Sequence, residues 1–265
     1  MQCNICDRHS DVIFKATILN KYIVNYYYCG HCRFLQTERP YWLEEAYTHS
    51  PGYLDTGMIS RNITLAKQSA VLLFFLFDPK ALYLDFAGGY GILTRIMRDI
   101  GFDFYWNDLY TPNLFAQGFE FNNNLKVELL TSFQSFEHFI HPLQEIAQLL
   151  TIADNILFTT ELLPNSVPSP EKWWYYSLYG GQHVSFYSYE TLRFVANKYK
   201  LNLLSNRRDI HLLTKRNISS AVFNALLRGS SLLYNYVRIS MNSKTIDDFN
   251  RLTILKQDSC GGDVT

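Results

Sequence analysis

The chain has 265 residues and a mass of 31.0 kDa, which leaves room for one full domain and a small additional module. Hydrophobic residues make up 48% of it and charged residues 18%, so it can bury a core and is not a disordered chain. Lys and Arg number 24, as do Asp and Glu. This zero net charge argues against binding to nucleic acid or anionic membrane through bulk charge.

The start of the chain, Met-Gln-Cys-Asn, has neither the basic residues nor the apolar run of a signal peptide. The longest apolar run, residues 70–77, is far below the ~20 residues that cross a bilayer. We therefore expect a cytoplasmic protein without a membrane span, with its cysteines in a reducing compartment.

Four of the five cysteines form two Cys-x-x-Cys pairs that enclose a predicted β-hairpin, residues 11–19 and 22–28, with a turn at Asn20-Lys21. Four thiolates at this spacing predict a zinc site, because they can surround the ion as a tetrahedron. A shell filled by thiolates has no open position for substrate, so the zinc would be structural. The alternative is four buried or redox-active cysteines, and the fifth, Cys260, is interpreted as an idle thiol. The predicted zinc ligands are Cys3, Cys6, Cys29 and Cys32.

After the hairpin, apolar residues recur alternately with helical and with strand periodicity. The predicted helices are residues 42–47, 59–77, 92–100, 136–150, 189–199 and 219–236. The predicted strands are residues 81–86, 103–107, 126–131, 155–160, 201–205 and 210–214. A long aromatic loop is expected over residues 162–187. The alternation predicts an α/β fold with a mostly parallel sheet, helices on both faces and an antiparallel hairpin at one edge.

The first predicted strand of this sheet runs into a glycine-rich turn, Ala87-Gly88-Gly89-Tyr90-Gly91. Such a turn lets a ligand approach the backbone and aims helix N-terminal amides at it. Asp108, at the end of the next strand, is placed to accept hydrogen bonds from ribose hydroxyls. Thr94 stands where a dinucleotide fingerprint has its third glycine, and Asp85 suits an ammonium group better than a pyrophosphate. The pattern favours S-adenosylmethionine, and the alternative is a turn that only connects strand to helix.

The segment from Asp85 to Gly91 resembles motif I of class I S-adenosylmethionine-dependent methyltransferases, Asp-x-Gly-x-Gly-x-Gly, with Ala87 at the first glycine. Residues 133–138, Phe-Gln-Ser-Phe-Glu-His, followed by Pro142, are similar to the family's Glu-Val-x-Glu-His segment, with Gln134 where an acid is usual. Residues 181–192 are similar to a late loop-and-helix block of members that act on small molecules.

The resemblance covers residues 60–215 and implies a Rossmann-like methyltransferase sheet preceded by a zinc-ribbon hairpin. It implies a zinc-ribbon-like module at 1–40, a linker and helical lead-in at 41–80, a methyltransferase domain at 81–216 and a C-terminal helix and tail at 217–265. The expected contacts of the cofactor are Asp85, Ala87, Gly88, Gly89, Tyr90, Gly91, Asp108, Leu109 and Phe133.

A cysteine cluster ahead of such a domain is similar to sugar C-methyltransferases that act on nucleotide-linked deoxysugars, although those enzymes are longer and carry a further C-terminal domain. The resemblance therefore implies a small polar acceptor, such as a nucleotide sugar or glycan precursor. The sequence identifies neither the methylated atom nor the oligomeric state.

Methyl transfer to such an acceptor often requires a base, and His183 is the best-placed histidine, in the loop after strand 155–160. Its alternatives are a substrate ligand or a loop histidine bonded to backbone. Glu161 would orient His183 or bind acceptor hydroxyls. The aromatic run after residue 172 suits a sugar ring, or else packs as a lid. The predicted substrate contacts are Trp173, Trp174, Tyr175 and Tyr176.

Two other functions fit parts of the sequence. An RNA methyltransferase with a zinc module is disfavoured by the zero net charge. A non-catalytic zinc-ribbon interaction protein stays open, because Gln134 replaces the usual acid.

Overall fold

The computed structural model describes residues 1–48, 55–122 and 125–260, the last six of them as backbone only. The chain forms two compact units. The first unit consists of residues 1–56 and 129–224, and the second of residues 57–128 and 225–265. Within the described ranges, none of the helices is both long and apolar enough to cross a bilayer.

The second unit contains a parallel strand pair together with helices that precede, connect and follow the two strands. β4 (Leu82–Phe86) pairs in parallel with β5 (Asp103–Asn107), with Leu82 opposite Asp103. α3 (Ile92–Ile100) connects the two strands, and α2 (Met58–Leu76) precedes them. α6 (Ser220–Ser240) begins in the first unit and continues into the second, where α7 (Thr245–Cys260) follows it.

The first unit contains a mixed sheet in the order β6-β7-β10-β9. β6 (Leu129–Ser132) and β7 (Asn155–Thr159) are parallel, and α4 (Pro142–Ile152) connects them. β10 (Ile210–Thr214) is antiparallel to both β7 and β9 (Asn202–Ser205). α5 (Tyr189–Lys198) precedes β9 and begins with a capping box between Ser188 and Thr191.

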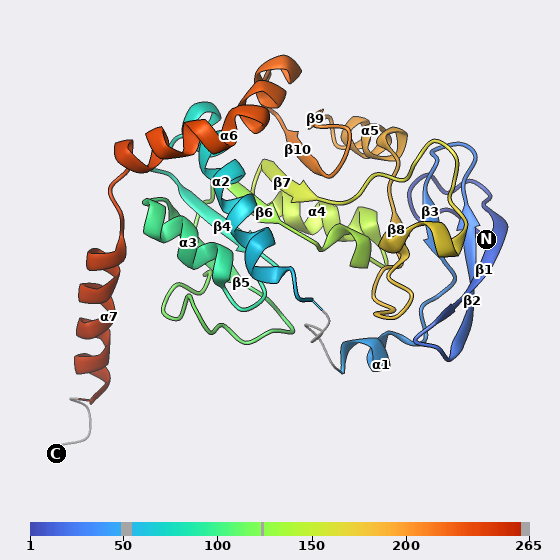
Figure 1. Cartoon of the computed structure of the whole chain (residues 1–265), viewed down its shortest axis with the longest axis horizontal. Helices are drawn as coiled ribbons and strands as arrows, with labels where there is room; N and C mark the ends of the chain where they lie inside the picture. Colours follow the sequence, from blue (N-terminus) through green and yellow to red (C-terminus); the bar gives the residue numbers. More distant parts are fainter. Residues whose placement is uncertain (49–54, 123–124, 261–265) are drawn as a thin grey trace. The chain divides into compact units, whose positions relative to one another are not determined.

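A second sheet of the same unit has the order β1-β2-β3-β8, and Figure 1 shows its strands side by side. Its strands are β1 (Asp11–Ile18), β2 (Tyr22–Tyr28), β3 (Leu35–Thr37) and β8 (Ser185–Phe186). β1 and β2 are joined by the three residues 19–21, because Ile18 pairs with Tyr22. Lys21 N donates to Ile18 O at 3.0 Å, and Leu19 and Asn20 both have a φ of 54°. α1 (Leu43–Tyr47) follows β3 in sequence. β8 pairs with β3 and joins the N-terminal hairpin to a much later part of the chain.

The predicted α/β, Rossmann-like fold class is confirmed, with several corrections to the elements. The single helix predicted over residues 136–150 is wrong: Phe136–His138 forms a short 3₁₀ turn, and α4 begins only at Pro142, since proline favours a first helical position. The predicted strand 126–131 starts three residues later, at Leu129. The expected loop 162–187 contains two 3₁₀ turns, Pro170–Lys172 and Trp174–Tyr176, and β8. β3 and α7 were not expected at all.

Candidate active site and metal centre

The glycine-rich turn between β4 and α3 is built from left-handed backbone. Ala87, Gly89 and Gly91 have φ of 55°, 54° and 85°. A Cβ at Gly91 would lie 2.8 Å from Asn113 Oδ1, and one at Gly88 would lie 2.7 Å from Asp85 Oδ2. The protein's own packing therefore requires glycine at 88 and 91. At Gly89, by contrast, a Cβ would meet nothing within 4 Å, so this is where the turn leaves room for a ligand.

Asp108 accepts hydrogen bonds from three backbone amides, one of them in this turn. Its Oδ2 accepts from Gly89 N at 2.9 Å, and its Oδ1 accepts from Tyr110 N and Thr111 N, both at 2.8 Å. A carboxylate has about four acceptor positions, so these bonds fix the group and leave capacity for one further donor. Trp106 supports the same turn, because its Nε1 donates to Gly89 O at 2.8 Å.

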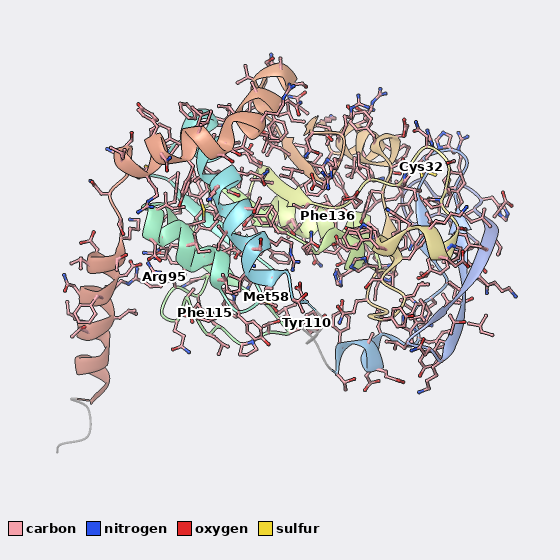
Figure 2. The ribbon with its side chains drawn as sticks, in the orientation of Figure 1. Cys32, Met58, Arg95, Tyr110, Phe115 and Phe136 are labelled. Atoms are coloured by element: carbon pink, nitrogen blue, oxygen red, sulfur yellow. The ribbon has the colours of Figure 1, made fainter. Side chains whose placement is uncertain are left out.

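Two acids therefore border the turn in different environments. Asp85 is buried at the end of β4 and accepts from Thr94 Oγ1 at 3.2 Å. Asp108 is half-buried at the end of β5, beside the strongly exposed Leu109 and Tyr110. Figure 2 labels Tyr110 and Phe115 on the segment that follows β5. An ammonium group and ribose hydroxyls, as in S-adenosylmethionine, fit these two acids and the open face at Gly89.

Not every predicted cofactor contact lies in this unit. Tyr90 belongs to the turn, and its carbonyl accepts from Leu114 N and Phe115 N, both at 3.0 Å. Phe133 follows β6 in the first unit, where it is half-buried.

A second polar cluster lies within the first unit and contains His183, His138 and Glu137. One ligand atom from each of the three side chains lies within 4.8 Å of the others, and the two imidazole rings are 5.0 Å apart. Such a group can share or pass a proton, and its atoms could also surround a cation. The fold thus brings His183 together with two residues that were not predicted to belong to the site.

Both imidazoles have a fixed orientation. His183 Nδ1 lies 2.7 Å from Tyr175 O, and because a carbonyl only accepts, this nitrogen carries the proton and Nε2 of the neutral ring keeps its lone pair. His138 Nδ1 lies 3.0 Å from the hydroxyl of Tyr47 at the end of α1. Burial lowers the pKa of His183 to about 4, and burial together with the nearby His183 lowers the pKa of His138 to about 3. Both rings are therefore neutral at pH 7.

Glu161 follows β7, and its neighbourhood is the turn between β9 and β10. Leu162 N donates to Arg208 O at 2.8 Å, and Thr160 N donates to Asp209 O at 3.1 Å. Burial and the charge of Asp209 raise the pKa of Glu161, while Arg208 opposes the rise. The pKa of Glu161 is thus affected by one acidic and one basic residue of this turn, Asp209 and Arg208.

The four consecutive aromatic residues divide between core and surface. Trp173, Tyr175 and Tyr176 are buried in a cluster with Tyr26 of β2 and Phe186 of β8. Trp174 is 74% exposed. A ring whose faces are covered by protein cannot stack on a sugar, so within this run the exposed indole is the one open to a ligand.

The four N-terminal cysteines form the tightest sulfur cluster among the described residues. All four Sγ atoms lie within 4.8 Å of one another, with Cys3–Cys32 and Cys6–Cys29 both at 3.4 Å. Zn–S bonds of about 2.3 Å in a tetrahedron place the sulfurs about 3.8 Å apart, so the cluster fits zinc. None of the four forms a disulfide. Figure 2 labels Cys32 in this region.

The two cysteine pairs share one backbone conformation. Asp7 N donates to Cys3 O at 3.0 Å, and Arg33 N donates to Cys29 O at 2.8 Å. Asp7 and Arg33, each four residues after the first cysteine of its pair, have φ of 60° and 59°. The repeated turn points both thiols of each pair to the same side.

The fold and the glycine-rich turn together are typical of α/β enzymes that bind a nucleotide-like cofactor. A family model described as a methyltransferase domain matches residues 60–206, more than half of the chain. The chain belongs to this family of methyltransferase domains. Among curated proteins no match was found.

Several solved methyltransferases are similar in fold. The chain is 14% identical to an O-methyltransferase family protein from Burkholderia thailandensis, with a TM-score of 0.49 and coverage of 66% of this chain and 62% of that one. It is 14% identical to magnesium protoporphyrin IX methyltransferase (ChlM) from Synechocystis PCC 6803 with bound SAH, with a TM-score of 0.42 and coverage of 65% and 93%. It is 10% identical to CalO1, a methyltransferase in calicheamicin biosynthesis, with a TM-score of 0.40 and coverage of 57% and 54%, so it spans about half of CalO1.

Proposed function

We propose that the chain methylates a small polar acceptor, a sugar or glycan precursor such as a nucleotide sugar, with His183 as the base. The observation that carries the base assignment is the hydrogen bond from His183 Nδ1 to Tyr175 O, because it leaves Nε2 as a proton acceptor. The sugar class rests on the four-cysteine segment ahead of the methyltransferase domain.

When bound, S-adenosylmethionine supplies a methyl group on its sulfonium. We assign the ribose contact to Asp108 and the contact with the ammonium group to Asp85. The cofactor would approach the backbone of the turn at Gly88, Gly89, Tyr90 and Gly91. The remaining proposed contacts are Ala87, Leu109 and Phe133.

On the acceptor side, His183 Nε2 would take the proton that the acceptor loses as its new bond to carbon forms. The neutral His138 beside it leaves no second positive charge to oppose that protonation. Glu161 would bind acceptor hydroxyls, and Trp174 would offer its exposed indole face to a sugar ring.

Calorimetry with S-adenosylmethionine and the Asp108→Ala variant tests the cofactor site. Losing a charge-assisted hydrogen bond should weaken binding by on the order of 1.5–3 kcal/mol. Asp78→Ala, at an exposed position between α2 and β4, is the control and should leave affinity unchanged. Equal affinities of Asp108→Ala and the unmodified protein would contradict the assignment.

The acceptor class is tested by a thermal-shift screen of nucleotide sugars in the presence of S-adenosylhomocysteine. A nucleotide sugar should raise the melting temperature and then be methylated on addition of S-adenosylmethionine. Methylation of an RNA fragment instead, with no response to nucleotide sugars, would favour the RNA methyltransferase alternative.

We also propose that Cys3, Cys6, Cys29 and Cys32 bind one structural zinc ion, in a module of residues 1–40 ahead of a methyltransferase domain of residues 81–216. Elemental analysis should find about one zinc per chain. Cys29→Ser should lose the ion, whereas Cys260→Ser should retain it. Protein purified without chelator and found free of metal would refute the proposal.

A further inference from the structure

Within the second unit, a buried ion pair connects α7 to α3. Asp248 Oδ1 lies 2.6 Å from Arg98 Nη2, and its Oδ2 accepts from Arg98 Nε and Arg95 Nη2, both at 2.8 Å. Asp248 and Arg98 are 4% and 3% exposed. A buried, bidentate pair of this kind fixes the position of the guanidinium rather than merely attracting it. Figure 2 labels Arg95 on the same helix, α3.

The fixed guanidinium of Arg98 packs on a ring from the segment that follows β5. Its Cζ lies 3.7 Å from the ring centroid of the buried Phe119. Arg98 Nη1 also donates to Phe104 O at 2.8 Å and to Asp103 at 2.6 Å. Close to this ring, a Cβ at Gly118 would lie 2.3 Å from Leu252 of α7. α7 thus contacts the segment around Phe119 directly, through Leu252, and indirectly, through Arg98.

That segment in turn holds Trp106. Trp106 N donates to Phe119 O at 2.8 Å, and Phe121 N donates to Trp106 O at 2.7 Å. The indole of Trp106 then donates to Gly89 O at 2.8 Å, at the position of the turn that is open to a ligand. An unbroken set of contacts therefore runs from Asp248 to Gly89 within one unit.

We propose that Asp248 is a positioning residue for the cofactor turn, acting through Arg98, Phe119 and Trp106. The inference rests on the cofactor site proposed above. It extends that site to a helix outside residues 60–206, the part of the chain that the family model matches. Without the Asp248 carboxylate, Arg98 loses its partner at Nε and Nη2 and is held only at Nη1, by Asp103 and Phe104 O. The guanidinium can then turn away from Phe119, and the segment that holds Trp106 loses this support.

The test compares Asp248→Asn with Asp247→Asn in the full-length chain. Both variants lose one negative charge from α7, but Asp247 is exposed. The indole N–H of Trp106, assigned with Trp106→Phe, should shift and exchange faster with solvent in Asp248→Asn only. The KM for S-adenosylmethionine should rise three- to tenfold in the same variant, with kcat unchanged.

A loss of thermal stability in Asp248→Asn with an unchanged Trp106 signal and unchanged KM would overturn the inference. If Asp248→Asn does not fold, Phe119→Leu decides, because it removes the ring under Arg98 and leaves the ion pair intact; it should show the same Trp106 and KM changes. A wrong assignment of the cofactor site would be recognised separately. In that case Asp108→Ala would bind S-adenosylmethionine normally, while the Trp106 signal would still report on Asp248.

Discussion

The two units of the molecule differ in the groups that titrate. All seven histidines of the sequence belong to the first unit, residues 1–56 and 129–224, and the sequence of the second unit contains none. The second unit instead buries a permanent ion pair, Arg98–Asp248. The proposed base and the proposed cofactor turn therefore depend on different interactions. Burial keeps the imidazoles around the proposed base uncharged. In the cofactor turn, the Asp108 carboxylate binds a backbone amide.

The largest expected effect is on stability in mild acid. Burial lowers the pKa of His138 to about 3 and those of His183 and His211 to about 4, below the ordinary value of about 6.5. The unfolded chain therefore binds more protons than the folded chain below about pH 6.5, and stability falls as the pH is lowered through that value. Between pH 7 and pH 5 the first unit should lose up to about 6 kcal/mol, at about 1.4 kcal/mol per proton and pH unit.

Hydrogen exchange, corrected for the intrinsic effect of pH, measures this difference. Protection should fall in β7 and β10 and persist in β4 and β5. His9→Ala, at an exposed histidine, should not alter the profile. Equal losses in both units would mean that histidine burial does not distinguish them.

The next effect concerns the base. His183→Ala should lower turnover by roughly 100-fold or more and leave the affinity for S-adenosylmethionine nearly intact. Because burial lowers the pKa of His183 to about 4, the acidic limb of the pH–rate profile should lie near that pH in the unmodified enzyme and vanish in the variant. An unchanged kcat with a raised KM for the acceptor would make His183 a substrate ligand. Glu161→Gln should keep the limb if Glu161 only binds substrate.

A smaller effect is expected at Gly89, where the second unit leaves room for the cofactor. Gly89→Ala places a methyl group in that space and should weaken S-adenosylmethionine binding about tenfold or more. It should also cost about 1 kcal/mol of stability, since φ is +54° there. Calorimetry and denaturant unfolding separate the two losses. Normal affinity would show that the cofactor does not approach this atom.

The smallest effect is expected two residues earlier, at the departure from the glycine motif. Ala87 already carries a methyl group at φ +55°, so Ala87→Gly relieves left-handed strain but adds freedom to the unfolded chain. We expect a net gain of about 0.5–1 kcal/mol in the free energy of unfolding, with unchanged cofactor affinity. A destabilised Ala87→Gly variant would indicate that the methyl group makes packing contacts worth more than the strain.

The same contrast explains how much could be predicted from the sequence. The cofactor turn is local: β4, the turn, α3 and Asp108 follow one another in 27 residues, Leu82 to Asp108, and their spacing carries the signal. The two cysteine pairs are local for the same reason. Most helices and strands were predicted within a few residues because their apolar periodicity is strong.

The histidine cluster is not local. His183 was identified by its place after a strand, but its neighbours Glu137 and His138 come from a segment that only the fold brings beside it. Tyr47, whose hydroxyl lies 3.0 Å from His138 Nδ1, comes from a third segment. The residues Glu137-His138 were visible within the motif-like segment, yet nothing in the sequence places them beside His183. α7 was missed because its apolar residues Ile246, Phe249 and Ile254 are exposed and its anchoring residue is an acid.

The pairing of β3 with β8 has a consequence for synthesis on the ribosome. The four cysteines and β1 to β3 are complete by Thr37, but Phe186 of β8 is translated about 150 residues later, which takes roughly 8–30 seconds. Through that interval the free edge of β3 and the apolar side of Tyr26 lack the partners that later cover them. Zinc bound by the nascent cysteines, as proposed above, would stabilise this hairpin in its native register until β8 emerges.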